Sequence, residues 1–152
     1  MSPEEKLKEL GIDLPDVPVP LGSYVPCVRS GQLLFLSGIL PLRNGKLVRT
    51  GRVGENITID EAREDARQAT INALSVLKAH AVNLGHIKRC VKITGFIASA
   101  PDFAEQPRVL NAASDLLFEI FGETGRHARA AVGVHVLPLK SPLEIEFIFE
   151  IA

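Results

Sequence analysis

The sequence predicts an α+β two-layer sandwich, in which a mixed sheet carries two helices on one face. Two long segments have apolar residues at helical spacing, and runs rich in β-branched residues precede, separate and follow them. The expected order of elements is β-β-β-α-β-α-β-β. The chain has 152 residues and shows no repeat or low-complexity segment. This length suits a single domain with a substantial core, so we expect one domain over residues 1–152.

Residues 1–21 are expected to form a short helix followed by an arm. Ser2 is a candidate N-cap, Pro3 suits the first helical position, and Gly11 suits the end of the helix. The next segment, IDLPDVPVPLG, holds three prolines in eleven residues. It cannot be a central strand, which predicts an extended arm.

Turn signals divide the following region into strands. The segment VPCVRSGQLLFLSGILPL contains two strand candidates around the turn signal Ser30-Gly31. Asn44-Gly45 is a strong hairpin signal and predicts a turn into a third strand, LVRTG.

The helices and the remaining strands follow from capping residues and periodicity. Thr58 and Glu61 form a capping box at the start of the longest helix, and Gly85 is its expected end. The segment QPRVLNAASDLLFEIFG predicts a second amphipathic helix that ends at Gly122. Strands are predicted between the helices (IKRCVKITGFIAS) and after them (HARAAVGVHVLPL and SPLEIEFIFEIA).

The last two strands are two-faced. Every second residue from Leu143 onward is apolar, and glutamates alternate with them. In the preceding strand the even-numbered residues are apolar. Its odd-numbered positions hold Arg129, Ala131, Gly133 and His135. We expect the apolar faces to contact the helices and the opposite faces to meet other subunits.

Arg129 is the most informative residue of the pattern. An obligate cation on a strand of Ala and Val must be paired, or it must be available for an anion. A cross-strand or intersubunit ion pair with a glutamate is one interpretation, and an anion-binding site is the other. Spacing alone leaves both open.

Composition weighs against several classes of protein. The net charge is −1, Trp is absent and there is one Tyr, which disfavours nucleic-acid binding. The N-terminus lacks the apolar run of a signal peptide, and no apolar segment is long enough to span a membrane. Cys27 and Cys90 fit no zinc or CxxC spacing, so we expect reduced, buried thiols in a cytoplasmic protein. Neither a phosphate loop nor a zinc-protease motif is present, and no metal site is expected.

Three motifs together resemble the RidA/YjgF family of enamine/imine deaminases, also called endoribonuclease L-PSP-like. They are GSYVPCVRSGQLLFLSGILP, ARAAVGVHVLP and LEIEFIFEIA, in this order between Gly22 and Ala152. The resemblance implies a chorismate mutase-like fold, assembled as a homotrimer with clefts between subunits. It also implies hydrolysis of reactive 2-imino or 2-enamino acids to 2-oxo acids and ammonia, with no metal or organic cofactor.

The resemblance assigns roles to particular residues. Arg129 matches the arginine that pairs with the substrate carboxylate. A planar guanidinium can donate two hydrogen bonds to one carboxylate, which explains why this residue is Arg and not Lys. Glu144 matches the glutamate that positions the attacking water. The remaining matches to cleft residues are Tyr24, Gly38, Asn111 and Ala131.

The sequence also departs from the family pattern. Ala131 stands where Cys is common, Ile39 where a polar residue is common, and Ser114 where an aromatic is common. The segment DFAEQPRVLN is about one helical turn longer than usual. This indicates a divergent branch. Two other functions remain: a non-catalytic trimer that binds a small carboxylate as sensor or scaffold, and an endoribonuclease, which charge and aromatic content disfavour.

Geometry sets one condition on a shared site. If the last two strands formed a tight hairpin, Arg129 would oppose roughly Glu150, and Glu144 would lie about 20 Å away at ~3.3 Å per residue. One site using both residues therefore requires either a non-hairpin pairing or two different subunits.

Overall fold

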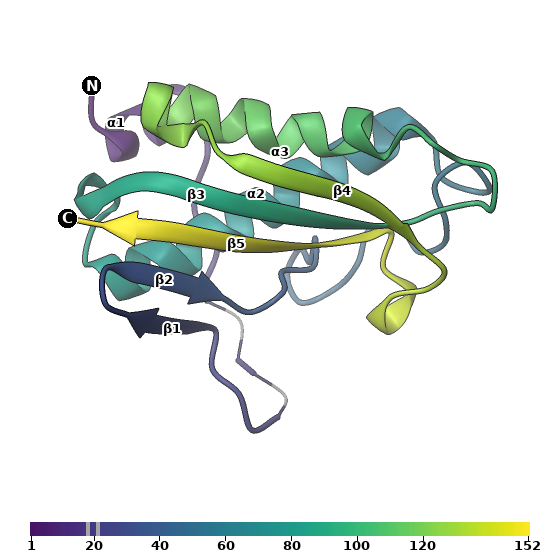
Figure 1. Cartoon of the computed structure of the whole chain (residues 1–152), viewed down its shortest axis with the longest axis horizontal. Coiled ribbons are helices and arrows are strands. Elements are labelled where there is room, and N and C mark those ends of the chain that lie inside the picture. The colour runs from purple at the N-terminus through teal and green to yellow at the C-terminus, as the bar shows by residue number, and fades with distance from the viewer. Residues whose placement is uncertain (18, 21) are drawn as a thin grey trace.

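The computed structural model describes residues 1–17, 19–20 and 22–152, and it confirms the predicted α+β class. In this part of the chain a five-stranded mixed sheet carries the two long helices on one face (Figure 1). The helices are α1 (Pro3–Glu9), α2 (Ile59–Ala81) and α3 (Gln106–Phe121). The strands are β1 (Cys27–Ser30), β2 (Leu33–Leu36), β3 (Ile87–Ala98), β4 (Ala128–Val134) and β5 (Leu143–Ile151). Short 3₁₀ turns occupy Leu84–His86, Gly122–Gly125 and Pro138–Lys140.

The predicted helix boundaries are largely confirmed. Ser2 and Thr58 are the N-caps of α1 and α2, and each forms a complete capping box. Gly11 and Gly122 have positive φ angles just beyond α1 and at the end of α3. The end predicted for α2 at Gly85 is wrong, because the helix stops at Ala81 and Gly85 lies in a 3₁₀ turn.

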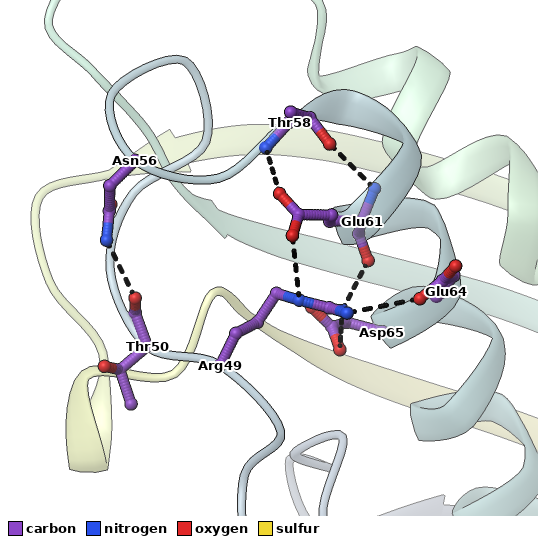
Figure 2. Close-up of polar contacts among 7 residues, drawn as sticks. All are labelled: Arg49, Thr50, Asn56, Thr58, Glu61, Glu64 and Asp65. Carbon is purple, nitrogen blue, oxygen red and sulfur yellow. Dashed lines mark hydrogen bonds and ion pairs between the residues drawn. The ribbon is translucent and has the colours of Figure 1, made fainter.

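The third predicted strand is absent, although its turn is present. Asn44 and Gly45 have positive φ angles, and the turn closes through an isolated bridge between Arg43 and Lys46. The segment beyond it pairs with no strand in the described structure. Instead the side chain of Arg49 turns toward the start of α2, where it donates to the carbonyl of Glu61 at 2.8 Å and pairs with Asp65 at 2.8 Å (Figure 2).

The sheet order β1-β2-β5-β3-β4 separates the last two strands. β3 pairs with β5 on one side in antiparallel fashion and with β4 on the other side in parallel fashion. β4 and β5 therefore form no hairpin, and β4 is an edge strand that runs alongside α3 (Figure 1).

The helix-facing side of the sheet forms the core. Alternate residues of β5 from Leu143 to Ile151 are buried there, as predicted. Alternation fails at the start of β3, where strict alternation would place Arg89 on the same face as Ile93. Two register shifts expose Arg89 and bury Cys90 instead.

The predicted orientation of β4 is wrong. Arg129 is the register partner of Ile93, and Ala131 is the partner of Gly95. Ile93 is fully buried beneath the helices, and Gly95 lies against Leu110 of α3, so the odd-numbered face of β4 contacts the helices. The apolar even-numbered face is open. The apolar pattern predicted the wrong orientation because β4 is an edge strand that lies beneath a polar side of α3.

Candidate functional site

Arg129 is held by one side of α3. Its Nη2 donates to Oδ1 of Asn111 at 2.8 Å and to the carbonyl of Pro107 at 3.4 Å. Its Nη1 donates to Oγ of Ser114 at 3.1 Å. The three acceptors lie at helical spacing of four and three residues, so they share a face. α3 therefore positions this guanidinium above the edge strand.

The guanidinium has only neutral partners. Among residues 1–17, 19–20 and 22–152, no carboxylate lies within ion-pair distance of Arg129. The side chain is partly buried. A pairing with a glutamate of the same chain is therefore wrong, and a positive charge without a counterion remains beside α3.

Ser114 joins Arg129 to His127. Nδ1 of His127 lies 2.7 Å from the carbonyl of Gly125, and Nε2 lies 2.8 Å from Oγ of Ser114. The pKa of His127 is lowered mainly by burial, with a further contribution from the charge of Arg129. At neutral pH the imidazole is therefore uncharged. Neither the strand pattern nor the family motifs indicated His127 as a site residue.

Asn111 and Ala131, two of the predicted cleft residues, lie near Arg129. Asn111 is bonded to Arg129 directly. Ala131 follows two residues along β4 on the same face, partly buried against the core. Arg129, Asn111 and Ala131 therefore form one group, which we call the arginine group.

Glu144 and Gly38 form a second contact elsewhere. A Cβ atom at position 38 would lie 2.8 Å from Cδ of Glu144, so only glycine leaves this space to the carboxylate. The backbones of Ile39 and Ile145 exchange two hydrogen bonds, of 2.9 and 3.0 Å, which fix the two segments against each other. The pKa of Glu144 is raised, first by burial and then by the negative charge of Glu146.

Tyr24 belongs to the same region as Gly38. Ser37, the neighbour of Gly38, donates through its hydroxyl to the carbonyl of Val25 at 2.6 Å. Its backbone amide donates to the carbonyl of Pro26 at 2.9 Å. The Tyr24 ring is 57% exposed. We call Tyr24, Gly38 and Glu144 the glutamate group.

The two groups point to opposite faces of the sheet. Arg129 shares a row with Ile93 on the helix face, whereas Glu144 is the partner of Phe96, on the open face. They lie two strands apart and three residues apart in register, roughly 14 Å between backbones at standard sheet spacings. Within one chain, the structure therefore does not bring Arg129 and Glu144 together.

A cavity lies between the start of α3 and the end of β4. Neither the arginine group nor the glutamate group lines it. That cavity has a volume of about 530 Å³ and is lined in part by Arg52, Ser99, Gln106 and Gly133. None of the expected site residues lines it.

The cysteines are structural in character. Cys27 and Cys90 are free and buried, as predicted. Burial raises the pKa of Cys27 and raises that of Cys90 to about 12, so neither is a thiolate near neutral pH. Within the described ranges, no three His, Cys, Asp or Glu side chains are grouped so that they could hold a metal ion. No helix there is long and apolar enough to cross a membrane.

Comparison with known proteins decides the family. The protein-family model described as "YjgF/chorismate mutase-like, putative endoribonuclease" matches residues 4–151. The chain belongs to the YjgF family. Protein TCP17 of Trypanosoma cruzi is 40% identical to this chain over 95% of this chain and 91% of that protein. The 2-iminobutanoate/2-iminopropanoate deaminase of Dermatophagoides farinae is 33% identical over 90% of this chain and 92% of that protein.

A solved structure matches the fold of this chain. The crystal structure of Atu1372 from Agrobacterium tumefaciens matches with a TM-score of 0.90 and 44% identity. The match covers 98% of this chain and 91% of that one. The family resemblance and the chorismate mutase-like fold expected from the sequence motifs are therefore confirmed.

Proposed function

We propose that this chain hydrolyses small 2-imino and 2-enamino carboxylates to 2-oxo acids and ammonia. The observation that carries the proposal is the guanidinium of Arg129, which is held by three neutral acceptors and has no counterion within the described chain. A partly buried cation of this kind attracts a carboxylate. A YjgF relative from Dermatophagoides farinae is named as a 2-imino acid deaminase, which supports a 2-imino acid as the bearer of that carboxylate.

Glu144 is the proposed base. Water adds to C2 of the protonated imine, the C=N electrons move to nitrogen, and the carboxylate of Glu144 takes the proton that the water loses, which gives a neutral carbinolamine. The carboxylic acid then returns this proton to nitrogen, ammonia leaves, and the C2 hydroxyl gives its proton to the carboxylate as the carbonyl forms. Transfer of that proton to the released ammonia regenerates the carboxylate. The raised pKa of Glu144 makes it a stronger base than an exposed glutamate.

We propose that a homotrimer completes the site. The arginine group and the glutamate group face opposite sides of one sheet, so a second copy has to supply one of them. The open face carries the apolar side chains Val28 and Phe35, which are register partners and are 53% and 40% exposed. Val132 on the edge strand is 40% exposed. Apolar surface of this kind is typical of a contact between subunits.

Ammonia release from 2-iminobutanoate generated in situ tests the activity. We expect the wild-type chain to accelerate release over buffer, and Glu144→Gln to abolish most of the acceleration. Glu150→Gln, on the same face of β5, is the matched control and is expected to retain it. Wild-type release equal to that in buffer contradicts the proposal. Binding of 2-oxobutanoate without any release favours the non-catalytic carboxylate binder.

The trimer has its own measurement. Sedimentation at micromolar concentration is expected to give three times the chain mass, and Phe35→Glu to weaken the assembly by placing a charge on the open face. Mixing inactive Arg129→Ala chains with inactive Glu144→Gln chains tests a site made by two copies. If the two groups come from different copies, some mixed clefts hold both intact groups and activity returns. A monomer in sedimentation, or no activity after mixing, contradicts the shared cleft.

A further inference from the structure

A line of hydrogen bonds connects Arg129 to the backbone before β4. Nη1 of Arg129 lies 3.1 Å from Oγ of Ser114, which in turn lies 2.8 Å from Nε2 of His127. Nδ1 of His127 then lies 2.7 Å from the carbonyl of Gly125. The line runs from the edge strand across α3 to the loop before β4, and the proposed reaction uses only its first member.

The direction of each bond follows from the groups themselves. A carbonyl oxygen can only accept, so Nδ1 of His127 carries a proton and donates it to Gly125. In the neutral ring Nε2 is then an acceptor, and the hydroxyl of Ser114 donates to it. The lone pairs of Ser114 are left for Arg129. The neutral imidazole therefore fixes the serine as an acceptor for the guanidinium.

We propose that Ser114 and His127 are a positioning pair that holds Arg129 ready for the carboxylate of its ligand. The ligand's identity rests on the proposed function, whereas the hydrogen-bond line does not. A free arginine side chain loses many rotamers when it binds an anion, and prior fixation removes part of that cost. Neither residue is assigned to contact the reacting atoms.

Other charged groups near His127 are already paired or lie elsewhere. His127 is partly buried, and Arg129 is the one charge that contributes to lowering its pKa. When the imidazole becomes protonated, Nε2 turns from acceptor to donor. Ser114 then accepts from two cations, and the guanidinium must readjust. The other charged groups of α3 and the adjoining loop are Arg108 (2.8 Å from Glu105), Asp115 (3.9 Å from Arg63), the exposed Glu119, and Glu123 (3.2 Å from Arg126). On β3, the exposed Lys92 lies beside Ala128 on the open face.

Nuclear magnetic resonance of the ligand-free full chain tests the pair directly. With ¹⁵N-labelled arginine and histidine, the Arg129 side-chain signal is expected to titrate with the midpoint of the His127 ring, whose pKa burial holds below the ordinary value for histidine. In His127→Gln, which retains an acceptor that cannot titrate, this pH response is expected to vanish. An Arg129 signal that follows neither His127 nor the removal of the Ser114 hydroxyl overturns the proposal.

Calorimetric titration with 2-oxobutanoate, a mimic of the product, measures the consequence for binding. Ser114→Ala is expected to weaken binding by about 3- to 10-fold, the usual effect of one hydrogen bond, and Ser114→Thr to restore it. His127→Phe is expected to weaken binding similarly, and His127→Gln to restore most of it. Ser30→Ala and His80→Gln, at exposed positions, are matched controls with wild-type affinity.

The two proposals fail in different ways. Equal affinity in wild type and Ser114→Ala contradicts the positioning pair while leaving the carboxylate site intact. A wild type that binds no 2-oxobutanoate contradicts the ligand assignment, and the resonance titration then still decides whether Ser114 and His127 control Arg129.

Discussion

Gly38 lies directly against the carboxylate of Glu144. A Cβ at position 38 would approach Cδ of Glu144 to 2.8 Å, which is closer than real Cβ contacts, and Oε1 to 3.1 Å, so the carboxylate would have to shift. The backbone of Gly38 does not have a positive φ, so its glycine is required by this contact and not by the turn. The position of the Glu144 carboxylate therefore depends on residue 38 having no side chain.

Gly38→Ala is expected to remain folded and to lose turnover by about tenfold or more, because a positioned acid or base contributes about 10²- to 10⁴-fold to a rate. Affinity for 2-oxobutanoate, which depends on Arg129, is expected to change less. The control is Gly38→Ala in a Glu144→Ala background, where the methyl group meets no carboxylate and should have no further effect. An additional loss in that background would show that Gly38 acts by another route.

The pH dependence of turnover is expected to change in Glu146→Gln. Glu144 accepts a proton only when ionised, so activity is lost as pH falls through its raised pKa. The negative charge of Glu146 contributes to that raised value. Removing the charge lowers the pKa of Glu144 and moves the acid limb of the pH–rate profile to lower pH.

The control for this shift is Glu150→Gln, because Glu150 lies on the same face of β5 and pairs with Lys88 at 3.1 Å. High salt should also reduce the difference between wild type and Glu146→Gln, since Glu146 is exposed and its charge is screened. An acid limb that stays in place would assign it to a group other than Glu144.

Local signals predicted the helices well. The capping boxes at Ser2 and Thr58 and the glycine at 122 each mark an element boundary through chemistry within one turn of chain. The orientation of β4 could not be predicted in this way. It depends on parallel pairing with β3, across a helix and a loop, and on which side of α3 lies above the edge.

The residues of the candidate site that could be predicted are those marked by a signal in the neighbouring sequence. Arg129 stands out as a cation on an apolar strand, and the family motifs supplied Glu144 and Asn111. The contact between Ser114 and His127 joins α3 to the loop that follows it, 13 residues along the chain, so no helical or strand periodicity indicates it. The failure of the strand predicted around Arg49 has a similar cause, because the local turn forms as predicted but a tertiary ion pair holds Arg49 against α2.

Arg49→Met is expected to lower the free energy of unfolding by about 3–5 kcal/mol, the usual result of leaving a buried charge without its partner. Asp65 is only 3% exposed, and its Oδ2 has no hydrogen-bond partner among the residues that the structure describes. Its pKa is already raised by burial in spite of Arg49. Loss of Arg49 raises that pKa further, so the destabilisation should be greatest at neutral pH and shrink as pH falls and Asp65 takes up a proton.

Urea unfolding of Arg49→Met at several pH values measures this effect. Arg108→Met is the control, because Arg108 pairs with Glu105 at 2.8 Å on the surface and its loss should leave stability nearly unchanged. Equal stability of Arg49→Met and wild type would show that the segment before α2 does not depend on this ion pair.

Arg129→Lys separates the charge of Arg129 from its shape. Lysine retains the positive charge, but its single ammonium cannot reproduce the fork that contacts Asn111 and Ser114 from two nitrogens. We expect the variant to melt near the wild-type temperature and to keep its oligomeric state. Loss of a charged hydrogen bond costs about 1.5–3 kcal/mol, so affinity for 2-oxobutanoate should fall by roughly 10- to 150-fold. Calorimetric titration of both proteins measures it, and equal affinities would reduce Arg129 to a structural link between β4 and α3.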